Sequence, residues 1–153
     1  MRAVVQRVAR AQVQVAGETI GVMGRGLLVL LGVGAADTDA DIAWTVSKIA
    51  TLRIFPDAAD RFDQSVSDID GGVLLISQFT LYGDVRRGRR PSFSAAAAPE
   101  IAAPMIDAAV LGLRALGLRV ETGRFGTSMQ VESINDGPVT ILLDSASHTV
   151  QSG

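Results

Sequence analysis

The sequence predicts an α+β fold, in which a largely antiparallel, barrel-like β-sheet with two main helices forms a single domain over residues 1–153. A length of 153 residues is typical of one domain. Strand-like apolar runs outnumber helical patterns, and the short link between the last two runs favours antiparallel pairing. Periodicity alone does not determine whether the sheet closes into a barrel.

The composition excludes several classes of protein. Hydrophobic residues make up 48% of the chain and charged residues 20%, which is typical of a packed globular protein. Because there is no cysteine, disulfides, thiolate nucleophiles and cysteine-ligated zinc are excluded. Arginines interrupt residues 1–10, so this segment does not resemble a signal peptide, and the longest apolar run, residues 27–33, is too short to cross a bilayer. We therefore expect a cytoplasmic protein with no membrane partner.

The charge balance limits contact with nucleic acid. A net charge of −2 is the opposite of what a protein that coats long stretches of phosphate backbone would carry, so any such contact must be local. One segment concentrates four arginines around Gly88: Arg86, Arg87, Arg89 and Arg90. Charge patterning alone leaves open whether this segment is a solvated loop or a binding surface.

Apolar patterns predict three strand regions before residue 80. Residues 4–15 alternate imperfectly, which predicts one or two strands, and a turn follows near Gly17. Residues 27–33 lack polar positions, as expected for a central strand covered on both faces. A second buried strand, residues 73–79, follows a pair of glycines.

The apolar spacing also predicts two helices. Asp37 or Thr38 can cap the first helix, whose apolar residues recur at three- and four-residue intervals until Pro56 ends the pattern. The second helix covers residues 99–117 and begins with a proline. Pro104 lacks a backbone donor and crowds the preceding turn, so it predicts a kink or a late start of this helix.

The remaining strands lie near the end of the chain. Strand-like segments occur at residues 118–121, 129–134 and 139–143. The turn-like residues 135–138 join the last two segments and predict an antiparallel hairpin. Residues 145–153 predict a loose C-terminal tail.

The residue inventory limits the available chemistry. The single histidine, His148, lies in the predicted tail, where we expect it to face solvent. The position of the single histidine argues against a Ser-His-Asp triad, and without cysteine only carboxylates remain as metal ligands. We therefore expect no metal and no cofactor.

Two segments place polar groups beside predicted core strands. The first, Ser77, Gln78, Phe79 and Thr80, closes the second buried strand. If that strand continued, Ser77 and Phe79 would share one face. The second is residues 135–140. Each has an ordinary interpretation, a strand end with satisfied hydroxyl groups and a routine turn, and neither determines function by itself.

Together, these segments resemble the two signature motifs of the D-aminoacyl-tRNA deacylase family. The motifs are a serine-glutamine-phenylalanine-threonine strand end and an asparagine-x-glycine-proline-x-threonine turn, and both are intact, at residues 77–80 and 135–140. The resemblance continues along nearly the whole chain, at residues 6–8, 26–33, 53–55, 90–93 and 122–125 and at Met129. It implies hydrolysis of the ester between a D-amino acid, or glycine, and the end of a tRNA.

The resemblance also implies a homodimer in which each chain completes the pocket of the other. In this family the glycine-proline turn, with its peptide bond cis, reaches into the partner's pocket. Gly137 and Pro138 match that turn, and Arg7 matches the arginine that pins it, so these three residues are the expected chiral filter. An L side chain would clash with the turn carbonyls, whereas glycine would pass.

The resemblance assigns the site residues as well. The aminoacyl group is expected beside the catalytic residues Ser77, Gln78, Phe79 and Thr80. The expected substrate-binding residues are Phe125, Met129, Asn135 and Thr140, with the terminal adenosine near the first two. Because no base is available to activate Thr80, we expect backbone N–H groups to stabilise the oxyanion and the 2′-hydroxyl of the substrate to assist water.

Two other functions are compatible with the same sequence. One is a non-catalytic nucleic-acid-binding module that uses residues 86–90, and the other is editing of L-aminoacyl-tRNA. The chain departs from the family at Ile106, where relatives often carry an aromatic residue, and in its alanine tract with Pro104. These departures concern the second helix rather than the site.

Overall fold

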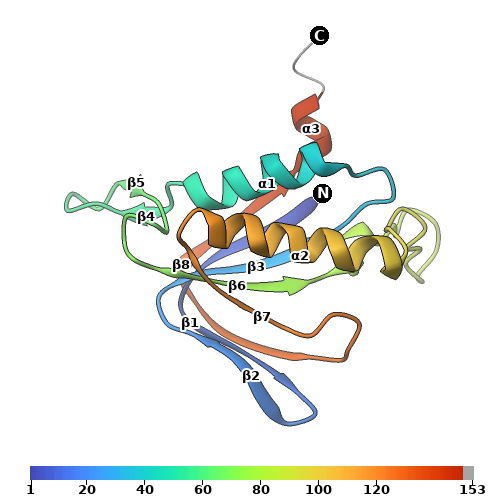
Figure 1. The fold of residues 1–153 in the computed structure, drawn as a ribbon, viewed down its shortest axis with the longest axis horizontal. Coiled ribbons are helices and arrows are strands. Elements are labelled where there is room, and N and C mark those ends of the chain that lie inside the picture. The colour runs from blue at the N-terminus through green and yellow to red at the C-terminus, as the bar shows by residue number, and fades with distance from the viewer. Residues whose placement is uncertain (150–153) are drawn as a thin grey trace.

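A computed structural model describes residues 1–149 as a curled β-sheet with helices packed on one side (Figure 1). The main sheet contains β1 (Arg2–Val15), β2 (Glu18–Met23), β3 (Gly26–Gly32), β6 (Gly72–Ser77), β7 (Arg119–Thr122) and β8 (Gln130–Asp144). A small ribbon contains β4 (Phe55–Pro56) and β5 (Phe62–Gln64). The helices are α1 (Asp39–Thr51), α2 (Pro99–Ala115), α3 (Ser145–Thr149) and the 3₁₀ turn η1 (Phe79–Tyr82).

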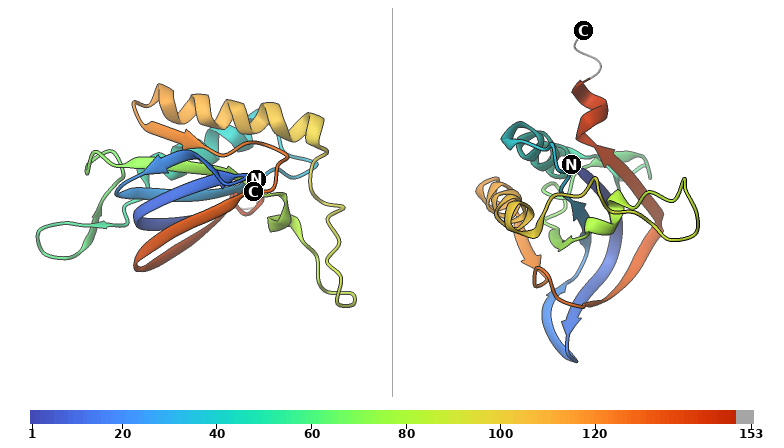
Figure 2. Two further views of the ribbon diagram at one scale, coloured as in Figure 1. Left: turned by 90° about the horizontal axis from the view of Figure 1, so that it is seen from below. Right: turned by 90° about the vertical axis from the view of Figure 1, so that its right-hand side faces the viewer.

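The sheet is mixed and nearly closes into a barrel (Figure 2). Its strand order is β2-β1-β3-β6-β7, and β8 pairs with β1. β1 is antiparallel to all three of its partners, whereas the β3–β6 and β6–β7 pairs are parallel. The predicted α+β class, the barrel-like sheet and the two main helices are confirmed. Parallel pairing arises because α1 and α2 lie on the crossovers between those strands.

Two hydrophobic cores explain why β3 lacks polar residues. Leu27, Val29 and Leu31 belong to the core beneath α1 and α2. Leu28 and Leu30 belong to a second core inside the barrel, where they pack with Ile76 and other strand residues. Both faces of β3 are therefore covered, as the apolar run predicts.

Both main helices begin where local chemistry favours it. The N-cap of α1 is Thr38, which forms a capping box with Asp41. α2 begins at Pro99, where a missing N–H costs nothing, and continues through Pro104 to Ala115. Of the two predicted effects of Pro104, the late start is wrong and the kink stays a prediction. None of the helices within residues 1–149 is long and apolar enough to span a membrane.

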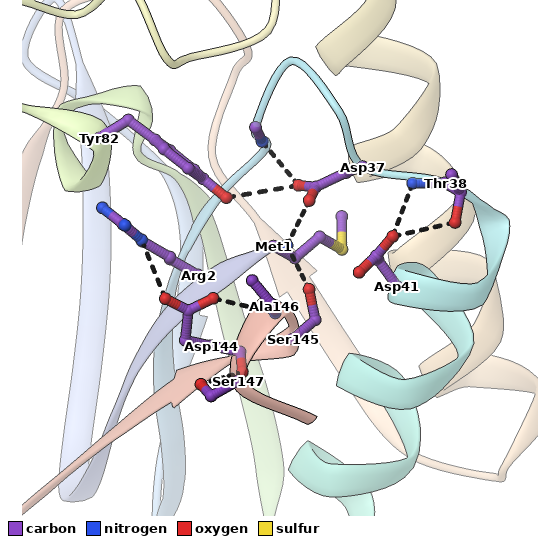
Figure 3. A network of polar contacts seen from close by, with 11 residues as sticks. Met1, Arg2, Asp37, Thr38, Asp41, Tyr82, Asp144, Ser145, Ala146 and Ser147 are labelled. Carbon is purple, nitrogen blue, oxygen red and sulfur yellow. Dashed lines mark hydrogen bonds and ion pairs between the residues drawn. The ribbon is translucent and has the colours of Figure 1, made fainter. Parts of the chain in front are cut away.

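A polar network joins the start of β1 to α1, β8 and α3 (Figure 3). The Met1 ammonium group forms an ion pair with Asp37 at 2.6 Å and donates to the Ser145 hydroxyl. Arg2 forms an ion pair with Asp144 at 3.2 Å. Burial and then the charge of Asp37 raise the pKa of Tyr82, which therefore remains a neutral donor to that carboxylate.

This network corrects the expected C-terminal tail. Residues 145–149 form α3 rather than a loose segment, because Ser145 is buried against the first residue of the chain. His148 is exposed, as expected, and stacks on Trp44 of α1 with 5.5 Å between ring centroids. The rest of the predicted tail, residues 150–153, lies outside the described residues.

The predicted hairpin near the end of the chain is wrong. Residues 130–144 form one strand, β8, and both of its halves pair with β1. The partner of Gln6 is Thr140, but the partner of Val8 is Asn135, so the turn-like residues form an insertion within the ladder opposite Arg7. Turn-forming residues therefore mark a bulge rather than a chain reversal.

Gly26 provides a stability test of the parallel β3–β6 pair. A Cβ atom at Gly26 would lie 2.0 Å from the carbonyl oxygen of Gly72, and two backbones cannot move apart without breaking the ladder. We expect Gly26→Ala to destabilise the fold by roughly 1–3 kcal/mol or more. For a protein of this size, each kcal/mol lowers the melting temperature by about 2–4 °C, so thermal unfolding monitored by circular dichroism detects the change.

Gly24→Ala is the matched control, because a Cβ atom at Gly24 would have nothing within 4 Å. Equal melting temperatures for the two variants would contradict the close approach of β3 and β6.

Candidate active site

The candidate site begins where β6 ends. The Gln78 N–H donates to the Leu31 carbonyl at 2.8 Å, and β6 then gives way to η1. A Cβ atom at Gly32 would lie 2.8 Å from the Gln78 carbonyl oxygen, so glycine allows this close approach. Phe79 and Thr80 therefore lie in a 3₁₀ turn, and the alternation of faces expected for a continuing strand is wrong beyond Ser77.

Three adjoining hollows surround this strand end, and Ser77 lines all of them. The apolar hollow, about 430 Å³, lies against the start of α2 and is also lined by Gln78, Phe79 and Phe125. The α2 hollow, about 370 Å³, shares Phe125 and extends along α2. The Met129 hollow, about 290 Å³, shares Gln78 and Phe79. Pockets of this size suit small ligands.

The structure brings some, but not all, of the predicted catalytic and substrate-binding residues together around these hollows. Ser77, Gln78 and Phe79 lie beside Phe125 in the apolar hollow and beside Met129 in the third. Thr80 lines none of the three hollows, and its hydroxyl accepts a hydrogen bond from the Gln78 amide.

Several lining residues have no assigned role in the sequence analysis. Phe93 packs edge-to-face on Phe79, with 5.0 Å between ring centroids, and both rings line the apolar hollow. Ile106 lines both the apolar and the α2 hollows, so the expectation that the departures at Ile106 and in the alanine tract do not concern the site is wrong. Phe93 could have been predicted from the sequence, because it belongs to residues 90–93, which resemble the family. Nothing in the sequence marks Ala96, Ala97 or Ala98 individually as pocket residues.

The second motif forms a separate cluster around Arg7. This side chain is 8% exposed and donates to the carbonyl oxygens of Asp136 and Ile54, both at 2.8 Å. Its Nε also lies 3.7 Å from the Asp136 carboxylate. The hydrogen bonds satisfy a charge that burial would otherwise penalise.

Side-chain bonds fix the rest of the turn. The Asn135 amide oxygen accepts from the Val139 N–H at 2.8 Å, and its nitrogen donates to the Thr140 hydroxyl at 3.1 Å. The Gly137–Pro138 peptide bond is cis, and both residues are exposed.

The two clusters are well separated within one chain. Arg7 pairs with Leu27 near the start of β3, whereas Ser77 pairs with Leu31 near the end of that strand. No residue of the 135–140 turn lines any of the three hollows. A single chain therefore presents the strand-end pocket and the glycine-proline turn at different places.

The polar groups of the pocket restrict its chemistry. Within residues 1–149 no group of three or more histidine or carboxylate side chains could hold a metal ion. His148 stacks on α1 and lines none of the hollows, so it is not placed to activate Ser77 or Thr80. The arrangement favours binding and positioning over attack by a side chain.

Comparisons with known proteins show which family the chain resembles. The family model of D-Tyr-tRNA(Tyr) deacylase matches residues 4–144. The chain is 60% identical over 146 residues to a D-aminoacyl-tRNA deacylase of Roseiflexus castenholzii, covering 95% of this chain and 93% of that protein. It is 56% identical over 145 residues to a D-aminoacyl-tRNA deacylase of Desulfitobacterium hafniense, covering 95% and 97%.

A solved structure with a closely similar fold is described as c-Myc DNA Unwinding Element Binding Protein. It superposes with a TM-score of 0.89 at 42% identity and covers 94% of this chain and 98% of that one. Because the family model and relatives above 50% identity cover nearly its whole length, the chain belongs to the D-Tyr-tRNA(Tyr) deacylase family.

Proposed function

We propose that this chain hydrolyses the ester bond of D-aminoacyl-tRNA and releases the free amino acid and tRNA. The observation that carries the proposal is the joining of Ser77, Gln78 and Phe79 with Phe125 and Met129 around adjoining hollows, in a chain of this family. Because aminoacyl-tRNA is used in translation, the proposed substrate favours a cytoplasmic location, which stays a prediction.

We assign the hollows to parts of the substrate. The terminal adenosine lies near Phe125 and Met129, where aromatic and thioether side chains suit a nucleobase. The aminoacyl group lies beside Ser77, Gln78 and Phe79. The apolar hollow leaves room for the side chain of the amino acid.

The reaction in this proposal needs no protein nucleophile. An aminoacyl ester on ribose is already activated, and its vicinal 2′-hydroxyl assists attack by water. The N–H groups of Phe79 and Thr80 are the first two of η1 and have no acceptor within that turn, so they suit an oxyanion. Such a donor contributes a factor on the order of 10²–10³ to the rate.

The direct test of function compares D-, L- and glycyl-tRNA as substrates. We expect release of amino acid from D-aminoacyl-tRNA, slower release from glycyl-tRNA, and none above background from the L-ester. Binding of tRNA without release would instead support a non-catalytic module, and release from the L-ester alone would support L-aminoacyl editing.

Thr80 tests the absence of a nucleophile. We expect Thr80→Ala to keep kcat within about tenfold of the parent, which corresponds to the loss of one hydrogen bond. Loss of a serine protease nucleophile instead lowers kcat on the order of 10⁶-fold. The measurement is single-turnover release from D-aminoacyl-tRNA.

Thr51→Ala removes a comparable hydroxyl from the end of α1 and serves as the control. A fall of Thr80→Ala to the uncatalysed rate with folding and tRNA binding intact, or an acyl group trapped on Thr80, would refute the proposal.

Chiral selection in this proposal comes from a second copy of the chain. The turn at Gly137 and Pro138, pinned by Arg7 and braced by Asn135 and Thr140, enters the pocket of the partner. Its separation from the strand-end hollows within one chain supports this arrangement. Glycine has no side chain to collide with the turn, so glycyl-tRNA is also a substrate.

The surface of β8 supports a homodimer. Val139 is the only residue of β8 that counts as buried, although a strand beside a core normally buries every second side chain. Ile134 and Leu142 are 47% and 77% exposed, and Phe62 is 55% exposed over Arg7. A long, unpaired edge with apolar side chains is a surface that another chain covers.

Mixed dimers test whether the turn acts on the partner. A Cβ atom at Gly137 would lie 2.7 Å from Cγ2 of Val139, at a φ of +143°, so Gly137→Ala displaces the turn. We expect this variant to hydrolyse the L-ester, with a loss of discrimination of roughly 10–200-fold. Ser77→Trp fills the hollows and should be inactive by itself.

When Gly137→Ala is mixed with a large excess of Ser77→Trp, each open pocket pairs with an intact turn. L-ester hydrolysis should then fall while D-ester hydrolysis persists. Unchanged L-ester hydrolysis in verified mixed dimers would show that the turn acts within its own chain.

A further inference from the structure

Residues 84–92 form a hairpin that extends from the body of the protein (Figure 2, left). Asp84 and Ser92 form its stem through two backbone hydrogen bonds of 2.8 and 2.9 Å. Gly88, near the tip, has a φ of +78°, which glycine adopts without strain. Residues 85–91 are all exposed, so the side chains of the hairpin are available to a ligand.

The four arginines of this hairpin are not equivalent. Arg86 forms an ion pair with Asp84 at 2.6 Å. Hydrogen bonds from the Arg86 side chain and then its backbone lower the pKa of Asp84 to about 2, so this pair stays charged at neutral pH. Across the described residues, no carboxylate forms an ion pair with Arg87, Arg89 or Arg90. These three charges are uncompensated in a chain whose net charge is −2.

The stem of the hairpin lies at the rim of the apolar hollow. Phe93 directly follows the stem and packs on Phe79, and both rings line that hollow. Four residues of extended chain reach about 13 Å, so the arginines lie within that distance of the stem. The arginines are therefore within reach of the phosphates of a strand whose last nucleotide enters the hollows.

We propose that Arg87, Arg89 and Arg90 bind the phosphates of the acceptor end of tRNA, upstream of the terminal adenosine. This inference rests on the proposed function, because it assumes that the tRNA end enters the hollows. Charge complementarity carries it, since exposed guanidinium groups bind phosphate oxygens in paired hydrogen bonds. The hairpin would thus orient the tRNA and leave the reaction to the strand end.

The salt dependence of tRNA binding tests the proposal without requiring catalysis. Fluorescence anisotropy gives the affinity for uncharged tRNA between 50 and 200 mM salt. Each phosphate contact on a single strand contributes about 0.7 to the slope of log affinity against log salt, so R87Q/R89Q/R90Q should lower the slope by about 2. Over this range the parent should lose roughly 20-fold more affinity than the variant.

Two further variants separate local contact from overall charge. R25Q/R53Q/R119Q removes the same number of charges from exposed positions that lie away from the hairpin, and it should keep the parental slope. R87K/R89K/R90K retains the charges and should keep most of the slope.

An unchanged slope in R87Q/R89Q/R90Q, or an equal loss in both glutamine variants, would overturn the proposal. Equal effects on binding of an unrelated DNA duplex and of tRNA would also overturn it, because the contact would then be non-specific. Hydrolysis of D-aminoacyl-adenosine by the parent tests the proposed function separately, since that substrate lacks the upstream phosphates.

Discussion

The buried guanidinium of Arg7 holds the larger of the two adjacent register shifts between β1 and β8. It bonds to the Asp136 carbonyl in the turn and to the Ile54 carbonyl between α1 and β4, both at 2.8 Å. One side chain therefore joins the inserted turn, β1 and the segment after α1. The turn lacks regular ladder bonds over its length, so these bonds and those of Asn135 define its shape. Because the charge is desolvated, removal of any acceptor would be costly.

The mixed topology decides where the pocket lies. Parallel pairing brings the ends of β3 and β6 to the same edge of the sheet, and ligand sites favour the carboxyl ends of such strands. The crossover to α2 returns along this edge, so the start of α2 lines the same hollow as Phe79 and Phe93. The hollow is thus a consequence of strand direction, while residues 77–80 determine its chemistry.

Apolar patterning predicted β3, β6 and both main helices because each buries a continuous face or stripe. The same reasoning failed at residues 135–138, since Asn, Gly and Pro favour any local departure from a straight strand and do not distinguish a hairpin from a bulge. It failed at residues 145–149 because α3 depends on contacts with Met1 and Trp44, which are remote in sequence. Family motifs pointed to Ser77, Gln78 and Phe79, which line the hollows, and to Thr80, which does not. Ile106 and the alanine tract were visible only as departures from the family, and nothing local in the sequence indicates that they form the pocket wall.

Positioning a reactive ester and excluding the wrong enantiomer have different physical requirements. Positioning needs hydrogen-bond donors and a pocket that fits the substrate. In the proposed function the end of β6, η1 and the start of α2 provide both within one chain. Exclusion needs a fixed obstacle close to the substrate Cα, and the turn at Gly137, held by bonds from Arg7 and Asn135, lines none of the hollows of its own chain. In the proposed dimer a symmetric pair of chains meets both requirements at once, because each turn can enter the other pocket. The exposed apolar side chains of β8 then become an interface, and the same contact that buries them fixes the distance between filter and ester.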